Sequence, residues 1–162
     1  ASILFGGGCR FPVGDPDALF DFELRLLRLQ LEMERSFLGN AAAAAGRPSV
    51  VLIDRGVCDV AAYVPPKMWG DLLAAIDTDQ QSAFARYDVV VHLASAACGA
   101  EAAYSASRPH FQLSQARALE ERTLSAWEEH PRRTLIDNGT DFAGKLDRAA
   151  DAIVRAVRGL RP

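Results

Sequence analysis

A short apolar run, Ser49–Asp54, ends in an acid and is followed at once by Arg55 and Gly56. Ligands of open α/β sheets bind at the carboxyl ends of the strands. At such an end Asp54 can hold a magnesium-bound water or accept a hydroxyl proton, and Arg55 can bind a phosphate through two hydrogen bonds. We interpret both as candidate catalytic residues, with Asp54 binding Mg²⁺ through water. The alternative is that Asp54 caps the next turn and Arg55 forms a surface ion pair.

A second candidate group is the arginines in and after the segment Ala96–Leu113, which the sequence predicts as a long connection between a strand and a helix. Long connections in small domains are often lids over a ligand. Arg108 lies in the connection, and Arg117 and Arg122 lie on the helix that follows. These arginines are candidates for closing over phosphates. Helix-surface ion pairs with the adjacent glutamates are an equal alternative.

The segment Gly139–Lys145 fits the pattern G-x-x-x-x-G-K, and it follows a predicted strand and opens a predicted helix. Leu146, however, stands where a phosphate-binding loop carries a magnesium-binding Ser or Thr. We therefore interpret the segment as a helix N-terminus capped by Thr140 or Asp141. The glycines at 6–8 are not a phosphate-binding loop either, because no G-K-[ST] follows them.

The elements that position these residues are predicted from apolar runs and helix signals. Three short apolar runs predict parallel strands at Val50–Ile53, Val89–Leu93 and Thr134–Ile136. Helices are predicted around and between them. Their ranges are 16 to about 46, 66–76, 113–127 and 142–157. Alternating strands and helices predict an α/β fold with a parallel sheet flanked by helices on both faces.

The composition is that of one globular domain, and we expect residues 1–162 to form a single, partial domain. The net charge is −3 with 49% apolar residues, which gives no broad basic surface for nucleic acid. No apolar run is long enough to span a bilayer. The three cysteines lack metal-ligand or disulfide-framework spacing, which favours a cytoplasmic protein, and the three histidines lack ligand spacing.

Four segments, VVLIDRGVCDVAAYVP, YDVVVHLASAACGAEAAY, SQARALEERTLSAWEEHP and TLIDNGTDFAGKLDR, resemble one known family in the same order. It is the AAA-type P-loop ATPase/kinase-like family that groups the kinase domain of the NAD-biosynthesis regulator NadR with the TRPL translocation-defect protein. The resemblance implies a three-layer nucleotide-kinase-like sandwich. It also implies that a first strand and a Walker A loop, which family members carry, lie outside these 162 residues.

The resemblance further implies roles for single residues. Asp54 and Arg55 occupy the family's acidic, Walker-B-like position, and Arg108 and Arg117 lie in its lid. A second set of residues is implied to lie near the nucleotide base: Asn138, Thr140 and Lys145. The family's lid usually has a Glu soon after the Arg, and no Glu follows Arg108 closely in this sequence.

The leading functional hypothesis is an ATP- or GTP-dependent NTPase or kinase-like phosphotransferase that uses Mg²⁺. Its partner would be the nucleotide together with an unidentified small molecule or protein. The alternative is a nucleotide-binding regulatory or trafficking module with little catalysis. Because no G-K-[ST] loop occurs in the sequence, we expect these 162 residues to bind nucleotide weakly or not at all.

Overall fold

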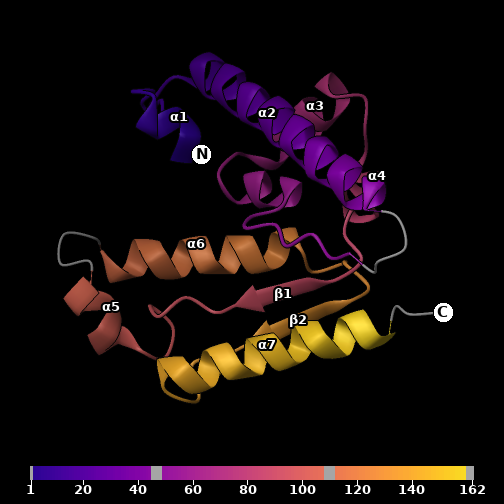
Figure 1. The fold of residues 1–162 in the computed structure, drawn as a ribbon. Coiled ribbons are helices and arrows are strands. Elements are labelled where there is room, and N and C mark those ends of the chain that lie inside the picture. The colour runs from indigo at the N-terminus through magenta and orange to yellow at the C-terminus, as the bar shows by residue number, and fades with distance from the viewer. Residues whose placement is uncertain (1, 45–48, 108–111, 160–162) are drawn as a thin grey trace. The chain divides into compact units, whose positions relative to one another are not determined.

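The computed structural model describes residues 2–44, 49–107 and 112–159. The chain divides into two compact units, residues 1–83 and 84–162. Figure 1 shows their helices and strands. No helix in the described ranges combines the length and the apolar character needed to cross a membrane.

The first unit is helical. It contains α1 (Ser2–Gly6), α2 (Pro16–Ala43), the 3₁₀ helix η1 (Val57–Ala62) and α3 (Pro66–Ala75), and α4 (Gln80–Phe84) lies at its end. The helices α2, η1 and α3 contact one another pairwise. Their contact buries a core of mostly apolar side chains, among them Leu27, Val57, Cys58, Val60, Trp69, Leu72 and Leu73.

The start of α2 follows from its sequence. The Asp15 carboxylate accepts hydrogen bonds from the backbone N–H groups of Asp17 (3.1 Å) and Ala18 (3.0 Å), and Pro16 occupies the first helical position. An Asp cap satisfies N–H groups that have no partner inside the helix, and a proline there gives up no needed donor. The predicted start of this helix is confirmed.

The second unit is built on a two-stranded parallel sheet. Strand β1 (Val90–Leu93) pairs with β2 (Arg133–Ile136) in the register Val91 to Thr134 and Leu93 to Ile136. Three helices accompany the sheet: α5 (Glu101–Ser107), α6 (Leu113–Ala126) and α7 (Phe142–Gly159). The prediction of parallel strands at these two places is confirmed.

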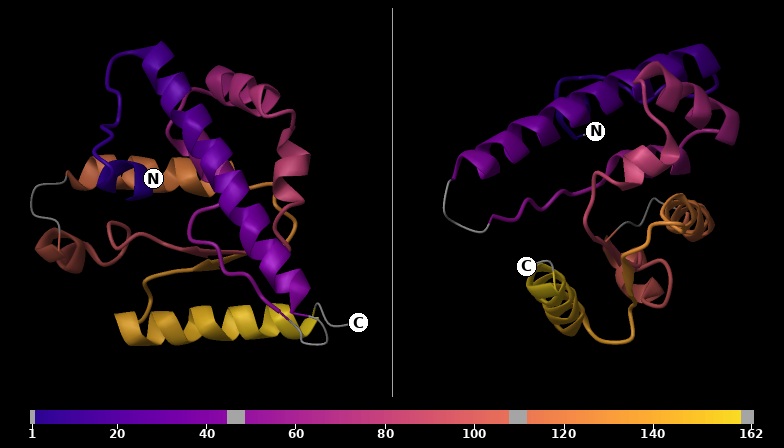
Figure 2. Two further views of the ribbon diagram at one scale, coloured as in Figure 1. Left: turned by 45° about the horizontal axis from the view of Figure 1, so that its top comes forward. Right: turned by 90° about the vertical axis from the view of Figure 1, so that its right-hand side faces the viewer.

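Alternation along β1 sends its side chains to opposite faces of the sheet. Val91 packs against a cluster formed by Ile136 of β2 with Ala149 and Ala152 of α7. The next residue, His92, faces the other way and contacts Glu120 of α6. Helices α6 and α7 therefore cover opposite faces of the β1–β2 pair, as Figures 1 and 2 also show.

The predicted strand at Val50–Ile53 is wrong for this structure. Residues 49–53 form neither helix nor strand, and the sheet of the described chain contains β1 and β2 alone. Val50 and Leu52 are 54% and 72% exposed. An apolar run becomes a strand only when a neighbouring strand pairs with its backbone, and the sequence pattern cannot supply that neighbour. The fold is α/β with a small sheet, and the more detailed three-layer sandwich remains a prediction.

The segment after β1 also differs from its prediction. Instead of one long connection from Ala96 to Leu113, the structure contains the short helix α5 within it. The alanine-rich stretch 101–107 favours a helix by intrinsic propensity, a signal that the prediction underweighted. The starts of α3, α6 and α7, at Pro66, Leu113 and Phe142, agree with the predicted helices.

Candidate functional site

The loop that carries Asp54 and Arg55 has a strained backbone. Arg55 has φ of 70°, in the left-handed region that residues with a Cβ rarely adopt. The following Gly56 is the N-cap of η1, and Asp59 occupies the third position of that helix. Such conformations cost about 1 to 3 kcal/mol and persist only where the surroundings hold them.

Asp59 provides one of the contacts that hold this loop. Its Oδ2 accepts a hydrogen bond from the Gly56 backbone N–H at 2.7 Å, and its Oδ1 accepts one from the Arg55 guanidinium at 3.2 Å. The Asp59 side chain is 12% exposed, whereas that of Arg55 is 60% exposed. The ion pair thus anchors an exposed guanidinium to a mostly buried carboxylate. The sequence interpretation missed Asp59, although its place three residues after Gly56 is the place of a helix-capping acid.

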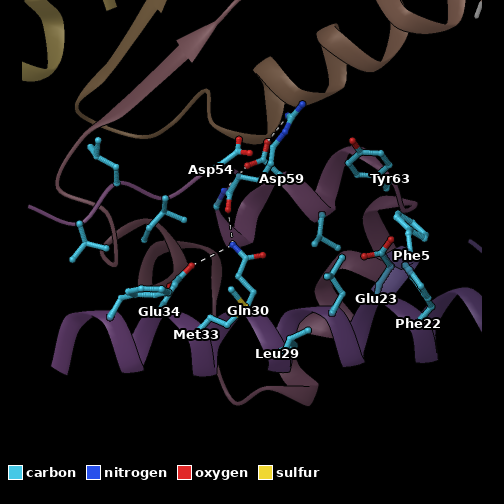
Figure 3. Close-up of a pocket in the computed structure, with 18 of the residues that line it drawn as sticks. Phe5, Phe22, Glu23, Leu29, Gln30, Met33, Glu34, Asp54, Asp59 and Tyr63 are labelled. Carbon is cyan, nitrogen blue, oxygen red and sulfur yellow. Dashed lines mark hydrogen bonds and ion pairs between the residues drawn. The ribbon is translucent and has the colours of Figure 1, made fainter. Parts of the chain in front are cut away.

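The second contact comes from α2. Gln30 donates from Nε2 to the backbone carbonyl of Arg55 at 2.7 Å and to Glu34 Oε1 at 3.2 Å. Figure 3 shows Gln30 reaching from the helix toward the loop of Asp54 and Asp59. The loop backbone is therefore fixed from two sides, by Gln30 and by Asp59.

A cavity of about 830 Å³ lies beside this loop, between α2 and residues 49–56. Its wall is mostly apolar, with Phe22, Leu29 and Met33 among the contributing side chains. It also includes Asp54 and Arg55 (Figure 3). The size lies within the range of small-molecule sites, so the predicted catalytic residues border a space that can hold a ligand.

Two of the residues predicted to bind nucleotide, Asn138 and Lys145, lie together in the second unit. The Lys145 ammonium donates to the backbone carbonyl of Ala94 and, at 2.7 Å, to Asn138 Oδ1. The Asn138 amide donates to the carbonyls of Ser95 (2.8 Å) and Cys98 (2.7 Å). These bonds tie the segment after β1 to the segment after β2 and to α7. Burial lowers the pKa of Lys145, with the positive charge of Arg148 adding to the effect.

The backbone of the G-x-x-x-x-G-K segment is engaged with carboxylates of its own loop. The Gly139 N–H donates to Asp137 Oδ1 at 3.0 Å, and the Gly144 N–H donates to Asp141 Oδ1 at 2.8 Å. An acid at the N-cap that accepts from the third helical residue is a helix cap. The geometry agrees with the capping interpretation through Asp141, and these N–H groups are not directed at a phosphate.

The other predicted nucleotide-binding residues differ in their surroundings. The Thr140 hydroxyl accepts a hydrogen bond from Arg148 at 3.1 Å. Arg117 donates from Nε to the Ala97 carbonyl at 2.9 Å and from its terminal nitrogen to Glu101 Oε1 at 2.6 Å. Arg108 lies outside the described residues. Arg117 thus links α6 to α5 and to the segment after β1.

The structure also contains a buried polar pair that the sequence interpretation missed. Glu120 Oε1 lies 3.0 Å from His92 Nε2 and accepts a hydrogen bond from the Ser95 backbone N–H at 3.0 Å. Both side chains are about nine-tenths buried. The only sequence signal was an unexplained His inside an apolar strand. The pair joins α6 to the end of β1, and we interpret it as structural.

The arrangement limits how a metal can be bound. No group of three or more His, Cys, Asp or Glu side chains suited to a metal ion occurs within residues 2–44, 49–107 and 112–159. A single carboxylate, such as Asp54, fits the way proteins bind Mg²⁺ together with waters and substrate phosphates. A single carboxylate provides too few ligands for a metal site built from protein groups alone. The three cysteines, Cys9, Cys58 and Cys98, are free thiols, and burial raises the pKa of Cys58 to about 12.

Residues 14–145 match the sequence family described as AAA domain, a range that begins just before α2 and ends in the first turn of α7. It includes Asp54, Arg55 and Lys145. No curated protein and no solved structure matches the chain.

Proposed function

Because the chain belongs to the AAA domain family, a P-loop NTPase-like group of nucleotide-binding domains, we propose that it is part of an ATP- or GTP-dependent NTPase or kinase-like phosphotransferase. The observation that carries the proposal is the family match, which covers most of the chain. The narrower relationship to the NadR and TRPL type of domain is part of the proposal and rests on the quoted sequence segments. A cytoplasmic location accompanies it.

In this proposal Asp54 is the catalytic carboxylate. It borders the 830 Å³ cavity and follows the apolar segment 49–53. Its role would be to hold a water of Mg²⁺ or to accept the proton of the attacking hydroxyl. Arg55, which Asp59 anchors at 3.2 Å, would contact a phosphate oxygen with the guanidinium nitrogens that the ion pair leaves over.

The G-x-x-x-x-G-K segment does not offer its donors to the phosphates. The backbone N–H groups of Gly139 and Gly144 are bonded to carboxylates, and Lys145 is bonded to two oxygens of the protein. In this proposal Gly139, Gly144 and Lys145 therefore do not hold the phosphates. Arg117, Asn138, Thr140 and Lys145 would then shape the nucleotide site by holding loop backbones, and Arg108 remains a predicted lid residue.

The test is nucleotide binding and turnover by the longest natural form of the protein. We expect Mg-ATP or Mg-GTP to bind with micromolar affinity in calorimetry and the γ-phosphate to be transferred or hydrolysed. Binding with negligible turnover would favour a regulatory or trafficking module instead. Absence of binding would overturn the proposal. Residues 1–162 alone are expected to bind weakly or not at all, and micromolar binding by them would show that one of their own loops holds the phosphates.

A further inference from the structure

The cavity of the first unit contains a buried acid that the nucleotide proposal does not use. Glu23, on α2, is 2% exposed and lines the cavity. Its Oε2 atom has no hydrogen-bond partner in the described part of the chain. Buried polar atoms are nearly always hydrogen-bonded, and each exception needs an explanation. Burial raises the pKa of Glu23 from 4.5 to about 7, so the carboxyl is only partly ionised near neutral pH.

Aromatic rings surround this acid. Phe22 stacks on Phe5 with ring centroids 5.8 Å apart and meets Phe11 edge-on at 5.6 Å. All three rings line the cavity, and Figure 3 shows Glu23 beside Phe5 and Phe22. Faces of aromatic rings attract cations, and rings also provide apolar contact for the body of a ligand.

The charges around the cavity have one predominant sign. Among the described residues its wall includes four acids, Glu23, Glu34, Asp54 and Asp59, and one base, Arg55. Arg55 is already paired with Asp59 at 3.2 Å. Acids in a mostly apolar wall favour a cation, because water screens their negative charge only weakly there.

We propose that this cavity binds a small organic cation, a protonated amine with an aromatic or aliphatic body, whose N–H group donates to Glu23 Oε2. The amine satisfies the unpartnered oxygen, and the body packs against the phenylalanines and against Leu29 and Met33. The proposal concerns the part of the cavity next to Glu23. It goes beyond the proposed nucleotide function at Asp54 and Arg55 and does not depend on it.

The test uses three probes of one shape and different charge: 4-phenylbutylamine, 4-phenylbutan-1-ol and 4-phenylbutyrate. Binding is measured by calorimetry at about pH 8, above the pKa of Glu23 and below that of a primary amine. We expect the amine to bind at least about tenfold more tightly than the alcohol, a difference of about 1.4 kcal/mol, and the acid not to bind. Equal binding of amine and alcohol, or no binding of the amine, would overturn the proposal.

Two variants identify the site. Glu23→Gln keeps the shape of the side chain and removes its charge, so we expect at least a tenfold loss of amine affinity with little change for the alcohol. Glu32→Gln, on the same helix with a side chain 62% exposed, is the matched control and should bind the amine as the unmodified protein does. Unchanged amine binding by a folded Glu23→Gln variant would contradict the assignment.

Met33→Trp provides a second line of evidence should Glu23→Gln fail to fold. Met33 lines the cavity and is 39% exposed, so a larger ring at this position can fill the space without entering the core. We expect it to weaken the amine and the alcohol alike. Full binding of the amine by a folded Met33→Trp variant would place the ligand elsewhere and overturn the proposal.

Discussion

The side-chain amide of Gln30, in the middle of α2, donates a hydrogen bond of 2.7 Å to the backbone carbonyl of Arg55. This contact joins residues 25 positions apart, and it fixes the backbone of the residue with the positive φ of 70°. The long helix thus determines the conformation of the loop that presents Asp54. The first two predictions test this relationship.

Replacing Gln30 by Leu should destabilise the protein by about 1 to 2 kcal/mol, because the Arg55 carbonyl loses its donor while the side chain keeps its size. Urea unfolding followed by circular dichroism measures the change. Arg25→Leu on the same helix is the control, since the Arg25–Asp21 contact is long (3.7 Å) and exposed. Equal stability of Gln30→Leu and the unmodified protein would mean that the loop does not depend on α2.

Arg55→Gly should be more stable than Arg55→Ala by about 1 kcal/mol, the reverse of the usual order of these two residues. Both variants lose the ion pair with Asp59, so the difference between their stabilities reports the backbone strain alone. Only the glycine relieves the strain at φ of 70°. Thermal melting of the two variants measures the difference. An alanine variant as stable as the glycine variant would show that the positive φ is not retained in solution.

Asp54→Asn in the longest natural form should lower turnover by a factor on the order of a hundred to ten thousand, with nucleotide affinity changed only a few-fold. The amide keeps the shape of the carboxylate but neither carries its charge nor accepts a proton. Steady-state phosphate release and calorimetry separate the two effects. Asp21→Asn on α2 is the control for loss of an exposed carboxylate. A rate within about twofold of the unmodified protein would reduce Asp54 to a structural residue.

Lys145→Met should destabilise the second unit by about 2 to 4 kcal/mol. Lys145 is 7% exposed and donates to Ala94 and Asn138, and the Met side chain leaves both oxygens without this donor. The other lysine of the protein, Lys67, has a side chain 87% exposed, and Lys67→Met should change stability by less than about 0.5 kcal/mol. If Lys145→Met melts normally but binds nucleotide poorly, the lysine contacts the ligand rather than the loop backbones.

The stability of the protein should fall as pH rises from about 5 to about 8, owing to Glu23. Its folded pKa of about 7 lies above the ordinary value of 4.5, so the protonated form favours folding. That contribution is complete below the ordinary value and is lost as pH passes through about 7. The shift corresponds to at most about 3 kcal/mol. Glu23→Gln carries no such charge and should lose less stability over this range, which melting curves at several pH values can test.

The sequence by itself predicted the local elements well. Asp15 and Pro16 fixed the start of α2, because a cap and a proline act on the nearest backbone groups. Apolar runs predicted both strands of the sheet and their parallel order, because a buried parallel strand needs a continuous apolar stretch. The capping interpretation of the Gly139–Lys145 segment also follows from the sequence alone. The segment lacks the Ser or Thr of a phosphate-binding loop and contains Asp141, which can cap a helix.

The contacts between residues that are far apart in sequence could be learned only from the folded structure. It left residues 49–53 without a pairing strand, because backbone pairing depends on a neighbour that periodicity cannot reveal. It placed Lys145 and Asn138 on carbonyls after β1, some 40 to 50 positions away, rather than in open solution. It also turned Glu23 into the cavity wall, where burial gives an ordinary glutamate an unusual pKa and an oxygen without a partner. Burial and partners of this kind are properties of the packed chain, whereas caps and apolar runs are properties of its neighbouring residues.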